Sequence, residues 1–171
     1  MKRLAIAVSI LALSISACAT SPTAPTPDPA PKFTATLLPT NEVPAVINAD
    51  AGASGTMTIT FNLTKDSAGN ITAATVDFSG TYSGFPNGSA LTASHIHTGA
   101  AGANGGVLVS TGITAGEVTF PAGSGTLNKT GITLTAAQAN AIMGNPAGFY
   151  FNSHTALNPG GAVRGQLIRT Q

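Results

Sequence analysis

The chain has 171 residues, of which only 8% are charged, and its 7 Lys+Arg against 6 Asp+Glu give a formal net charge of +1. Ordinary soluble domains carry charge on roughly a quarter of their residues. With so few basic residues, a surface that binds nucleic acid through its phosphates is nearly excluded. A single Cys excludes a disulfide framework within the chain. The 20 Gly argue against a coiled coil or a large helical bundle.

The first residues have the layout of an export signal. A cationic start, Met1-Lys2-Arg3, precedes an almost unbroken apolar run at residues 4–13, which has the length of a signal-peptide core. The run is too short to span a bilayer, which takes about 20 residues. It leads to Ile15-Ser16-Ala17-Cys18, which resembles the bacterial lipobox. This resemblance implies cleavage before Cys18 and lipidation of its sulfur and new amino group; an ordinary secretory signal with an incidental Cys is the alternative.

The segment after Cys18 reads as a tether. Residues 19–32 contain 5 Pro, so this stretch cannot bury a core and is expected to be extended. We therefore divide the chain into a lipoprotein signal peptide (1–17), a lipidated Cys with a Pro-rich tether (18–32) and one folded domain (33–171). The predicted location is the extracytoplasmic side of the cell envelope, anchored by lipid. Ala19, in place of Asp, would permit sorting to the outer membrane in a Gram-negative envelope.

The folded part predicts an all-β domain. Residues 56–63 alternate apolar and polar side chains and form a hairpin with residues 71–78, across a turn-rich break at 65–70. Short strands at this spacing with Gly-rich turns favour an antiparallel, Greek-key-like β-sandwich or a partly open barrel. The further strand candidates are residues 90–96, 106–110, 117–121, 125–127, 148–153 and 162–169.

One segment predicts a helix. Thr135 and Gln138 have the spacing of a capping box, and Gly144 followed by Pro146 would end the helix. We expect a short helix at about 135–143 that packs its apolar residues on the sheet. Long Gly/Ala/Asn loops such as residues 98–106 are the places where function is expected.

Three His are present, two of them in the sequence His95-Ile96-His97 and the third at His154. Alternate residues of a strand share a face, so His95 and His97 are expected on one side with Ile96 toward the core. Both groups end a strand. If these ends lie at the same edge, three imidazoles converge on a site suited to Cu or Zn. The alternative is that the rings hydrogen-bond to nearby loop backbone.

Several motifs together resemble the CHRD domain, a family named for its occurrence in chordin. The resemblance spans residues 33–169 and implies an extracytoplasmic all-β domain, without a settled activity. Ala45 stands where a second Pro is usual, and Ala162 stands where Glu is common, which removes a carboxylate near the Gly-Gly turn. The motifs that carry the resemblance are Asn41-Glu42-Val43-Pro44, residues 93–99, residues 102–105 and residues 150–166.

A fainter resemblance links the chain to copper/zinc superoxide dismutases, which also place a His-x-His sequence at a strand end of a β-sandwich. It implies that His95, His97 and His154 match three copper ligands. The bridging His and the Asp of the zinc site have no evident counterpart in this sequence.

Glu42 and Arg164 are charged residues in apolar or Gly/Pro surroundings. An internal, bidentate ion pair between them would fix the first loop to the last strand. A ligand-binding role for Arg164 is the alternative.

No catalytic residues are predicted, because the chain has no nucleophile elbow, no phosphate-binding loop and no evident pair of catalytic carboxylates. The leading interpretation is a non-enzymatic, lipid-anchored domain with a binding, adhesive or structural role. Its partner would be an extracytoplasmic protein or glycan, besides the membrane itself, and not nucleic acid. The alternative is a domain that holds Cu or Zn on the three His for storage, transfer or redox chemistry.

Overall fold

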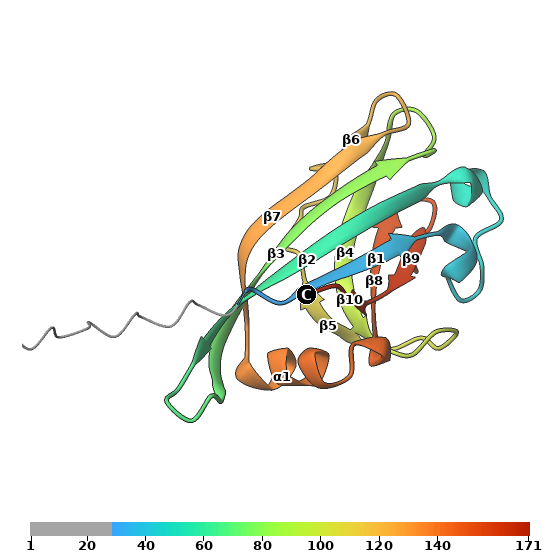
Figure 1. Ribbon diagram of the computed structural model, residues 1–171. Helices are drawn as coiled ribbons and strands as arrows, with labels where there is room; N and C mark the ends of the chain where they lie inside the picture. The colour runs from blue at the N-terminus through green and yellow to red at the C-terminus, as the bar shows by residue number, and fades with distance from the viewer. Residues whose placement is uncertain (1–28) are drawn as a thin grey trace, which may run out of the picture.

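The computed structural model describes residues 29–171, so the predicted signal peptide, Cys18 and most of the tether lie outside the described residues. The first of its two sheets has five antiparallel strands in the order β10-β1-β2-β3-β7. This order places the C-terminal strand beside the first strand (Figure 1). The strands are β1 (Lys32–Leu37), β2 (Ser54–Lys65), β3 (Ile71–Ser83), β7 (Gly125–Leu134) and β10 (Ile168–Arg169).

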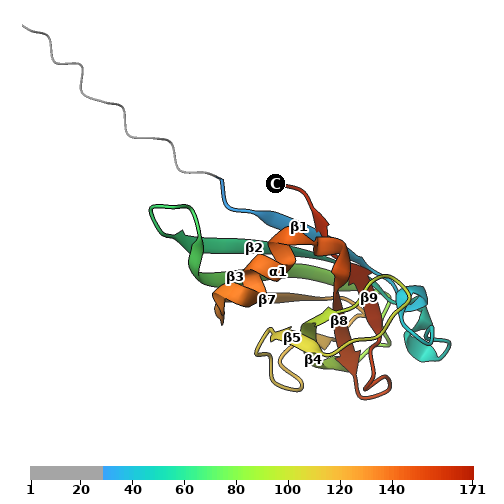
Figure 2. The ribbon, with the colours of Figure 1, turned by 90° about the horizontal axis from the view of Figure 1, so that it is seen from below.

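The second sheet packs against the first and is also antiparallel, in the order β5-β4-β8-β9, with a short strand β6 paired to the start of β4. The two layers are seen edge-on in Figure 2. The fold is therefore an all-β sandwich, as predicted, and the described strands close no barrel. The strands of this sheet are β4 (Ser89–Thr98), β5 (Val107–Ser110), β6 (Thr119–Phe120), β8 (Phe149–Thr155) and β9 (Val163–Gln166).

The core lies between the two sheets and follows from the alternation of the strands. Met57, Ile59 and Phe61 on β2 are fully buried, and Ile96 on β4 is buried opposite them. Phe78 of β3 contacts Phe151 of β8 across the interlayer space, with ring centroids 5.7 Å apart. The hairpin predicted from residues 56–63 and 71–78 is confirmed as β2 and β3 in register.

Helix α1 (Ala136–Gly144) covers one open end of the sandwich (Figure 2). Its N-cap is Thr135, and both hydrogen bonds of the predicted capping box are present. Ile142 is fully buried against the core. Three short 3-10 helices complete the described secondary structure: η1 (Pro39–Asn41), η2 (Ala49–Gly52) and η3 (Pro146–Gly148). Among residues 29–171, no helix has the length and apolar character needed to cross a membrane.

Several strands differ from the prediction, and the differences at β1, β7 and the C-terminal strands have a clear cause or consequence. Strand β1 is a full member of the first sheet, although its sequence was not among the strand candidates. Strand β7 continues to Leu134 instead of ending at residue 127. Its polar middle resembles a turn, but a bulge with Gly131 at φ +69° keeps it paired to β3, and the Gly131 N–H donates to Asp77 (2.7 Å). The segment predicted at 162–169 is split into β9 and β10.

Candidate metal centre

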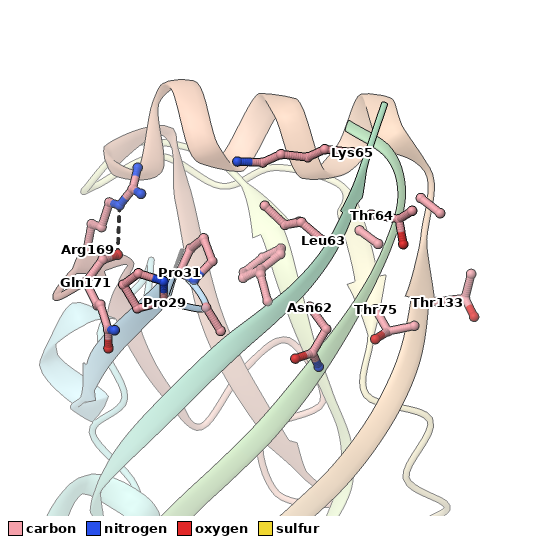
Figure 3. Close-up of a pocket in the computed structure, with 14 residues that line it drawn as sticks. Pro29, Pro31, Asn62, Leu63, Thr64, Lys65, Thr75, Thr133, Arg169 and Gln171 are labelled. Atoms are coloured by element: carbon pink, nitrogen blue, oxygen red, sulfur yellow. Dashed lines mark hydrogen bonds between the residues drawn. The ribbon is translucent and has the colours of Figure 1, made fainter. Parts of the chain in front are cut away.

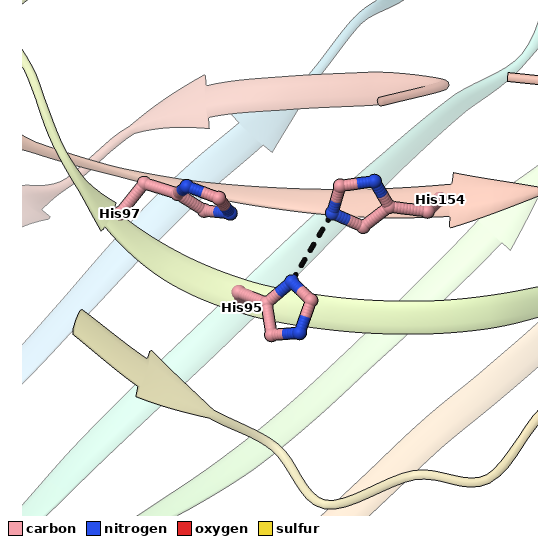
Figure 4. Close-up of side chains that lie close together, drawn as sticks. All are labelled: His95, His97 and His154. Carbon is pink, nitrogen blue, oxygen red and sulfur yellow. Dashed lines mark hydrogen bonds between the residues drawn. The ribbon is translucent and has the colours of Figure 1, made fainter. Parts of the chain in front are cut away.

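Strands β4 and β8 bring the three His to the outer face of the second sheet. His95 and His97 lie two residues apart on β4, opposite Asn152 and Tyr150 of β8, and His154 follows two residues after Asn152. Cross-strand partners and alternate residues share a face. One ring nitrogen from each His lies within 4.8 Å of the others, and the three rings point toward one another (Figure 4). Ile96 points the other way and is fully buried.

Backbone carbonyls fix the hydrogen on two of the three rings. A carbonyl oxygen only accepts hydrogen bonds, so His97 Nδ1–H donates to Gly105 O (3.0 Å) and His154 Nδ1–H donates to Pro159 O (3.0 Å). The lone pair of each ring is therefore on Nε2. His97 Nε2 is buried and has no hydrogen-bond partner among residues 29–171. His154 Nε2 accepts from His95 Nδ1 at 3.1 Å.

The rings of His95 and His154 are held in their neutral form. Burial lowers the pKa of His95 to about 4, and the neighbouring His154 and His97 lower it further by repulsion between like charges. Burial also lowers the pKa of His154, against a smaller opposite effect of its bond to the Pro159 carbonyl. Neutral imidazole is the form that binds metals. His97 adds a third ring nitrogen to these two, and the cluster consists of three His without a carboxylate.

The loop at residues 99–106 positions His97, and Arg164 holds this loop. The Arg164 guanidinium donates to the Asn104 side chain (3.1 Å) and to the carbonyls of Ala100 (3.1 Å) and Ala103 (2.7 Å). Arg164 is 1% exposed. Because Gly105 belongs to the same loop, Arg164 acts on the orientation of His97 through the backbone.

The Tyr150 ring contacts both His97 and Arg164 on this face. Its ring stacks on the His97 ring with centroids 5.0 Å apart and an interplanar angle of 10°. The Arg164 guanidinium carbon lies 3.3 Å from the centre of the same ring, a cation–π contact. The three side chains therefore form a continuous packed group beside the His cluster.

Glu42 lies on the same face but does not bind Arg164 directly. In the described part of the chain, the hydrogen bonds of the Arg164 guanidinium go to the 99–106 loop, and the first loop is fixed to β9 by the backbone pair Leu38–Arg164 and by Asn41. Burial raises the pKa of Glu42 to about 7, while the charge of Arg164 and the Asn152 side chain act in the opposite direction. The Arg164 charge therefore acts on Glu42 without the direct bidentate contact that the sequence suggested.

A third loop supports His154. Asp50 is buried and accepts hydrogen bonds from the Thr155 hydroxyl (2.6 Å) and the Asn158 amide (2.5 Å). These contacts hold the turn that carries the Pro159 carbonyl. Gly161 completes the turn at φ +141°, a backbone conformation that favours Gly.

Sequence reasoning singled out the three His, Glu42 and Arg164 but missed the supporting residues Tyr150, Asn152 and Asp50. The signal for the first two was present, since they alternate with His154 along β8 and must share its face. Asp50 gave no signal, because it lies in a short 3-10 helix far from His154 in the chain.

The His cluster lies away from another hollow in the described part of the chain. A cavity of about 860 Å³ lies near α1 at the other side of the fold (Figure 3). Its walls combine Pro29 and Pro31 with the ends of β2 and β3 and with Arg169. Mixed polar and apolar walls without converging functional groups give this cavity no defined chemistry.

The fold and site define a β-sandwich with a polar, loop-covered face. The sequence model of the CHRD domain matches residues 33–167. The chain belongs to the CHRD domain family. A search of curated proteins found no match, and a search of solved structures found none either. The resemblance to copper/zinc superoxide dismutases stays one of motif spacing.

Proposed function

We propose that this CHRD domain binds a transition metal, Cu or Zn, on His95, His97 and His154. The observation that carries the proposal is the convergence of three ring nitrogens within 4.8 Å. The unpartnered, buried Nε2 of His97 supports it, because a buried nitrogen lone pair without a donor is costly unless a ligand takes it.

The donor set favours particular metals. Three imidazole nitrogens suit Zn and Cu, while carboxylate oxygens, which Mg and Ca prefer, are absent from the cluster. Two of the rings donate Nδ1–H to backbone carbonyls. In metal sites, His ligands are commonly oriented by such a hydrogen bond from the ring nitrogen that does not bind the metal. Three protein ligands leave a fourth position for water or another small ligand.

The test is metal titration of the purified protein by calorimetry with Zn²⁺ and Cu²⁺ in separate experiments. We expect one metal per chain and, for Cu²⁺, an electron paramagnetic resonance spectrum with nitrogen hyperfine coupling. His97→Ala should abolish both results. The matched control is Thr81→Ala on the opposite sheet, which should bind like the wild type. Absence of binding at micromolar metal would refute the proposal.

The lipid anchor is part of the same proposal. Cys18 follows an apolar run and small residues, and the Pro-rich segment 19–32 would hold the domain away from the membrane surface. Several acyl chains on one residue give durable anchoring, since each buried CH₂ contributes about 0.8 kcal/mol. Cys18→Ser should release the protein from membranes in cell fractionation, and continued membrane association of this variant would contradict the anchor.

A second candidate function is adhesion to an envelope glycan, and the outer face of the first sheet favours it. This face carries uncharged hydroxyl and amide side chains in two rows across β1, β2, β3 and β7. Neighbours in a row are about 4.8 Å apart and the rows are about 6.8 Å apart, so the face offers evenly spaced hydrogen-bonding groups. The rows are Thr36, Thr56, Thr81 and Thr126, and Thr34, Thr58, Ser79 and Asn128.

Sedimentation of the protein with insoluble envelope polysaccharide tests this candidate. A charged variant, Thr56→Glu with Thr81→Glu, should weaken sedimentation at least several-fold, while His97→Ala should leave it unchanged. If the wild type does not sediment, or if both variants behave alike, the hydroxyl rows are not an adhesive surface.

A further inference from the structure

The three His differ in how firmly their rings are held. The rings of His97 and His154 each donate Nδ1–H to a backbone carbonyl at 3.0 Å, so both present Nε2 in a fixed direction. His95 lacks this support, and in the described part of the chain its ring makes one hydrogen bond, from Nδ1 to His154 Nε2 at 3.1 Å. His95 is also only half-buried, while the other two are 8% exposed.

The hydrogen bond between His95 and His154 cannot persist once a metal is bound. Nε2 of His154 has one lone pair, which accepts the hydrogen of His95 in the metal-free protein and would bind the metal in the loaded protein. A metal therefore displaces His95 from His154 before His95 becomes a ligand itself. His97 and His154 form the fixed part of the site, and His95 is the ligand that joins last and leaves first.

The side of the second sheet next to His95 is open. The strand order places β5 on the side of β4 away from β8 (Figure 4). His95 pairs with Ser110 of β5, so the two side chains share the outer face, and Ser110 is exposed. On the β8 side, the partner of His95 is Asn152, which is 2% exposed. An incoming molecule therefore reaches the site over β5.

We propose that His95 is the exchangeable ligand of the metal site, and that the domain exchanges its metal with a partner protein that approaches over β5. The chemistry that selects this partner is an exposed ligand with a free lone pair, such as a neutral imidazole on its surface. This inference rests on the proposed metal function and adds the kind of partner that the site serves.

The exchange step moves electron pairs and no net proton. An imidazole nitrogen of the partner donates its lone pair to the metal, and the bond from the metal to His95 breaks with its electron pair returning to the ring. Further partner ligands then replace His97 and His154 in the same way. The metal keeps its oxidation state, so no oxidant or reductant takes part, and His95 donates to His154 again in the emptied site.

The first experiment follows zinc transfer from the zinc-loaded protein to the coloured chelator pyridylazoresorcinol by stopped-flow absorbance. We expect the rate to rise in proportion to the chelator concentration without a plateau, because the chelator attacks the metal while His97 and His154 still hold it. Ser110→Tyr places a ring on the path over β5 and should slow the transfer several-fold at unchanged zinc affinity.

The matched control is Ser79→Tyr on the outer face of the first sheet, which should transfer zinc like the wild type. Ser79 and Ser110 are both exposed strand residues, and each side chain makes one hydrogen bond that the change to Tyr removes. The two variants therefore differ in their place relative to the His cluster.

The second experiment is calorimetric titration of His95→Ala and His154→Ala with Zn²⁺. A hydrogen bond that orients a His ligand contributes about ten-fold to metal affinity. Since His95 has no such bond to the backbone, His95→Ala should lose about ten-fold less zinc affinity than His154→Ala.

The outcomes separate the two proposals. If the wild type binds no zinc, the metal function itself is wrong. If zinc binds but its transfer rate does not depend on the chelator concentration, the exchange is wrong while the metal site stands. Equal transfer by Ser110→Tyr and the wild type, or equal losses of affinity in His95→Ala and His154→Ala, would also overturn the exchange. Should Ser110→Tyr fail to fold, the concentration dependence and the two His variants decide.

Discussion

The outer faces of the two sheets are built from the same strand alternation and yet have opposite characters. On the first sheet, Thr56 and Thr81 are exposed, and their hydroxyl groups face solvent. On the second, Asn152 and Arg164 are nearly as buried as the core, at 2% and 1% exposure. Covering loops make the difference: residues 39–48, 99–106 and 155–162 lie over β8 and β9. Burial of polar side chains carries a desolvation cost, and on this face the buried polar side chains surround the three His.

The largest expected effect is on metal binding. His97→Ala removes the nitrogen with a buried, unpartnered lone pair, and one of three ligands is lost. We expect zinc affinity to fall at least 100-fold, measured by calorimetry at pH 7. Thr81→Ala, on the other face, should leave the affinity within two-fold. Equal effects of both changes would remove the distinction between the faces.

Arg164→Lys tests the loop that covers the second sheet. A lysine ammonium cannot reproduce the planar fork that satisfies Asn104, Ala100 and Ala103. We expect the free energy of unfolding to fall by about 2–3 kcal/mol and zinc affinity to fall about ten-fold. The control is Arg169→Lys at the exposed C-terminal strand, expected within about 0.5 kcal/mol. Arg164→Lys with full stability would show that the loop does not depend on the guanidinium.

Glu42→Gln tests the cost of burying charge on the covered face. The pKa of Glu42 is raised from 4.5 to about 7 in the folded protein. A raised carboxyl pKa gives stability that is complete below pH 4.5 and is lost as the pH rises through 7. Metal-free wild type should therefore lose about 2 kcal/mol relative to Glu42→Gln between pH 5 and pH 8, measured by urea unfolding.

The control for this pH dependence is Glu117→Gln in the exposed loop before β6. Hydrogen bonding to Lys129 lowers the pKa of Glu117, so its small contribution has the opposite sign and disappears as the pH falls. A flat difference between wild type and Glu42→Gln across this range would mean that Glu42 is ionised at all these pH values.

Thr135→Ala tests an element outside both faces. The change removes the side-chain half of the capping box of α1, which is expected to cost about 1 kcal/mol of folding stability. Zinc affinity should not change. Thr130→Ala in an exposed part of β7 is the matched control, expected within about 0.5 kcal/mol. A loss of zinc affinity in Thr135→Ala would show that the helix end supports the metal site.

Much of the fold could be predicted from the sequence because several of its elements follow from short local sequence patterns. The alternation of Met57, Ile59 and Phe61 placed β2, and the capping box placed the start of α1. The extension of β7 past residue 127 could not be predicted, because its pairing depends on a bulge at Gly131 that Asp77 of another strand stabilises.

The grouping of the three His could be predicted from the sequence, but the residues that support them could not. Strand alternation placed His95 and His97 on one face. The position of His154 at another strand end suggested that its ring could lie near the other two. The partners of Arg164 could not be predicted, because backbone carbonyls of a Gly-rich loop carry no sequence signal. The same holds for the Gly105 and Pro159 carbonyls that fix the tautomers of His97 and His154.

The most direct test of the central claim is anomalous X-ray diffraction at the zinc edge from crystals of the protein grown with one equivalent of Zn²⁺. The account predicts a single peak at about 2.0–2.1 Å from Nε2 of His97, from Nε2 of His154 and from one ring nitrogen of His95. A peak at another part of the surface, or crystals without bound zinc, would contradict it.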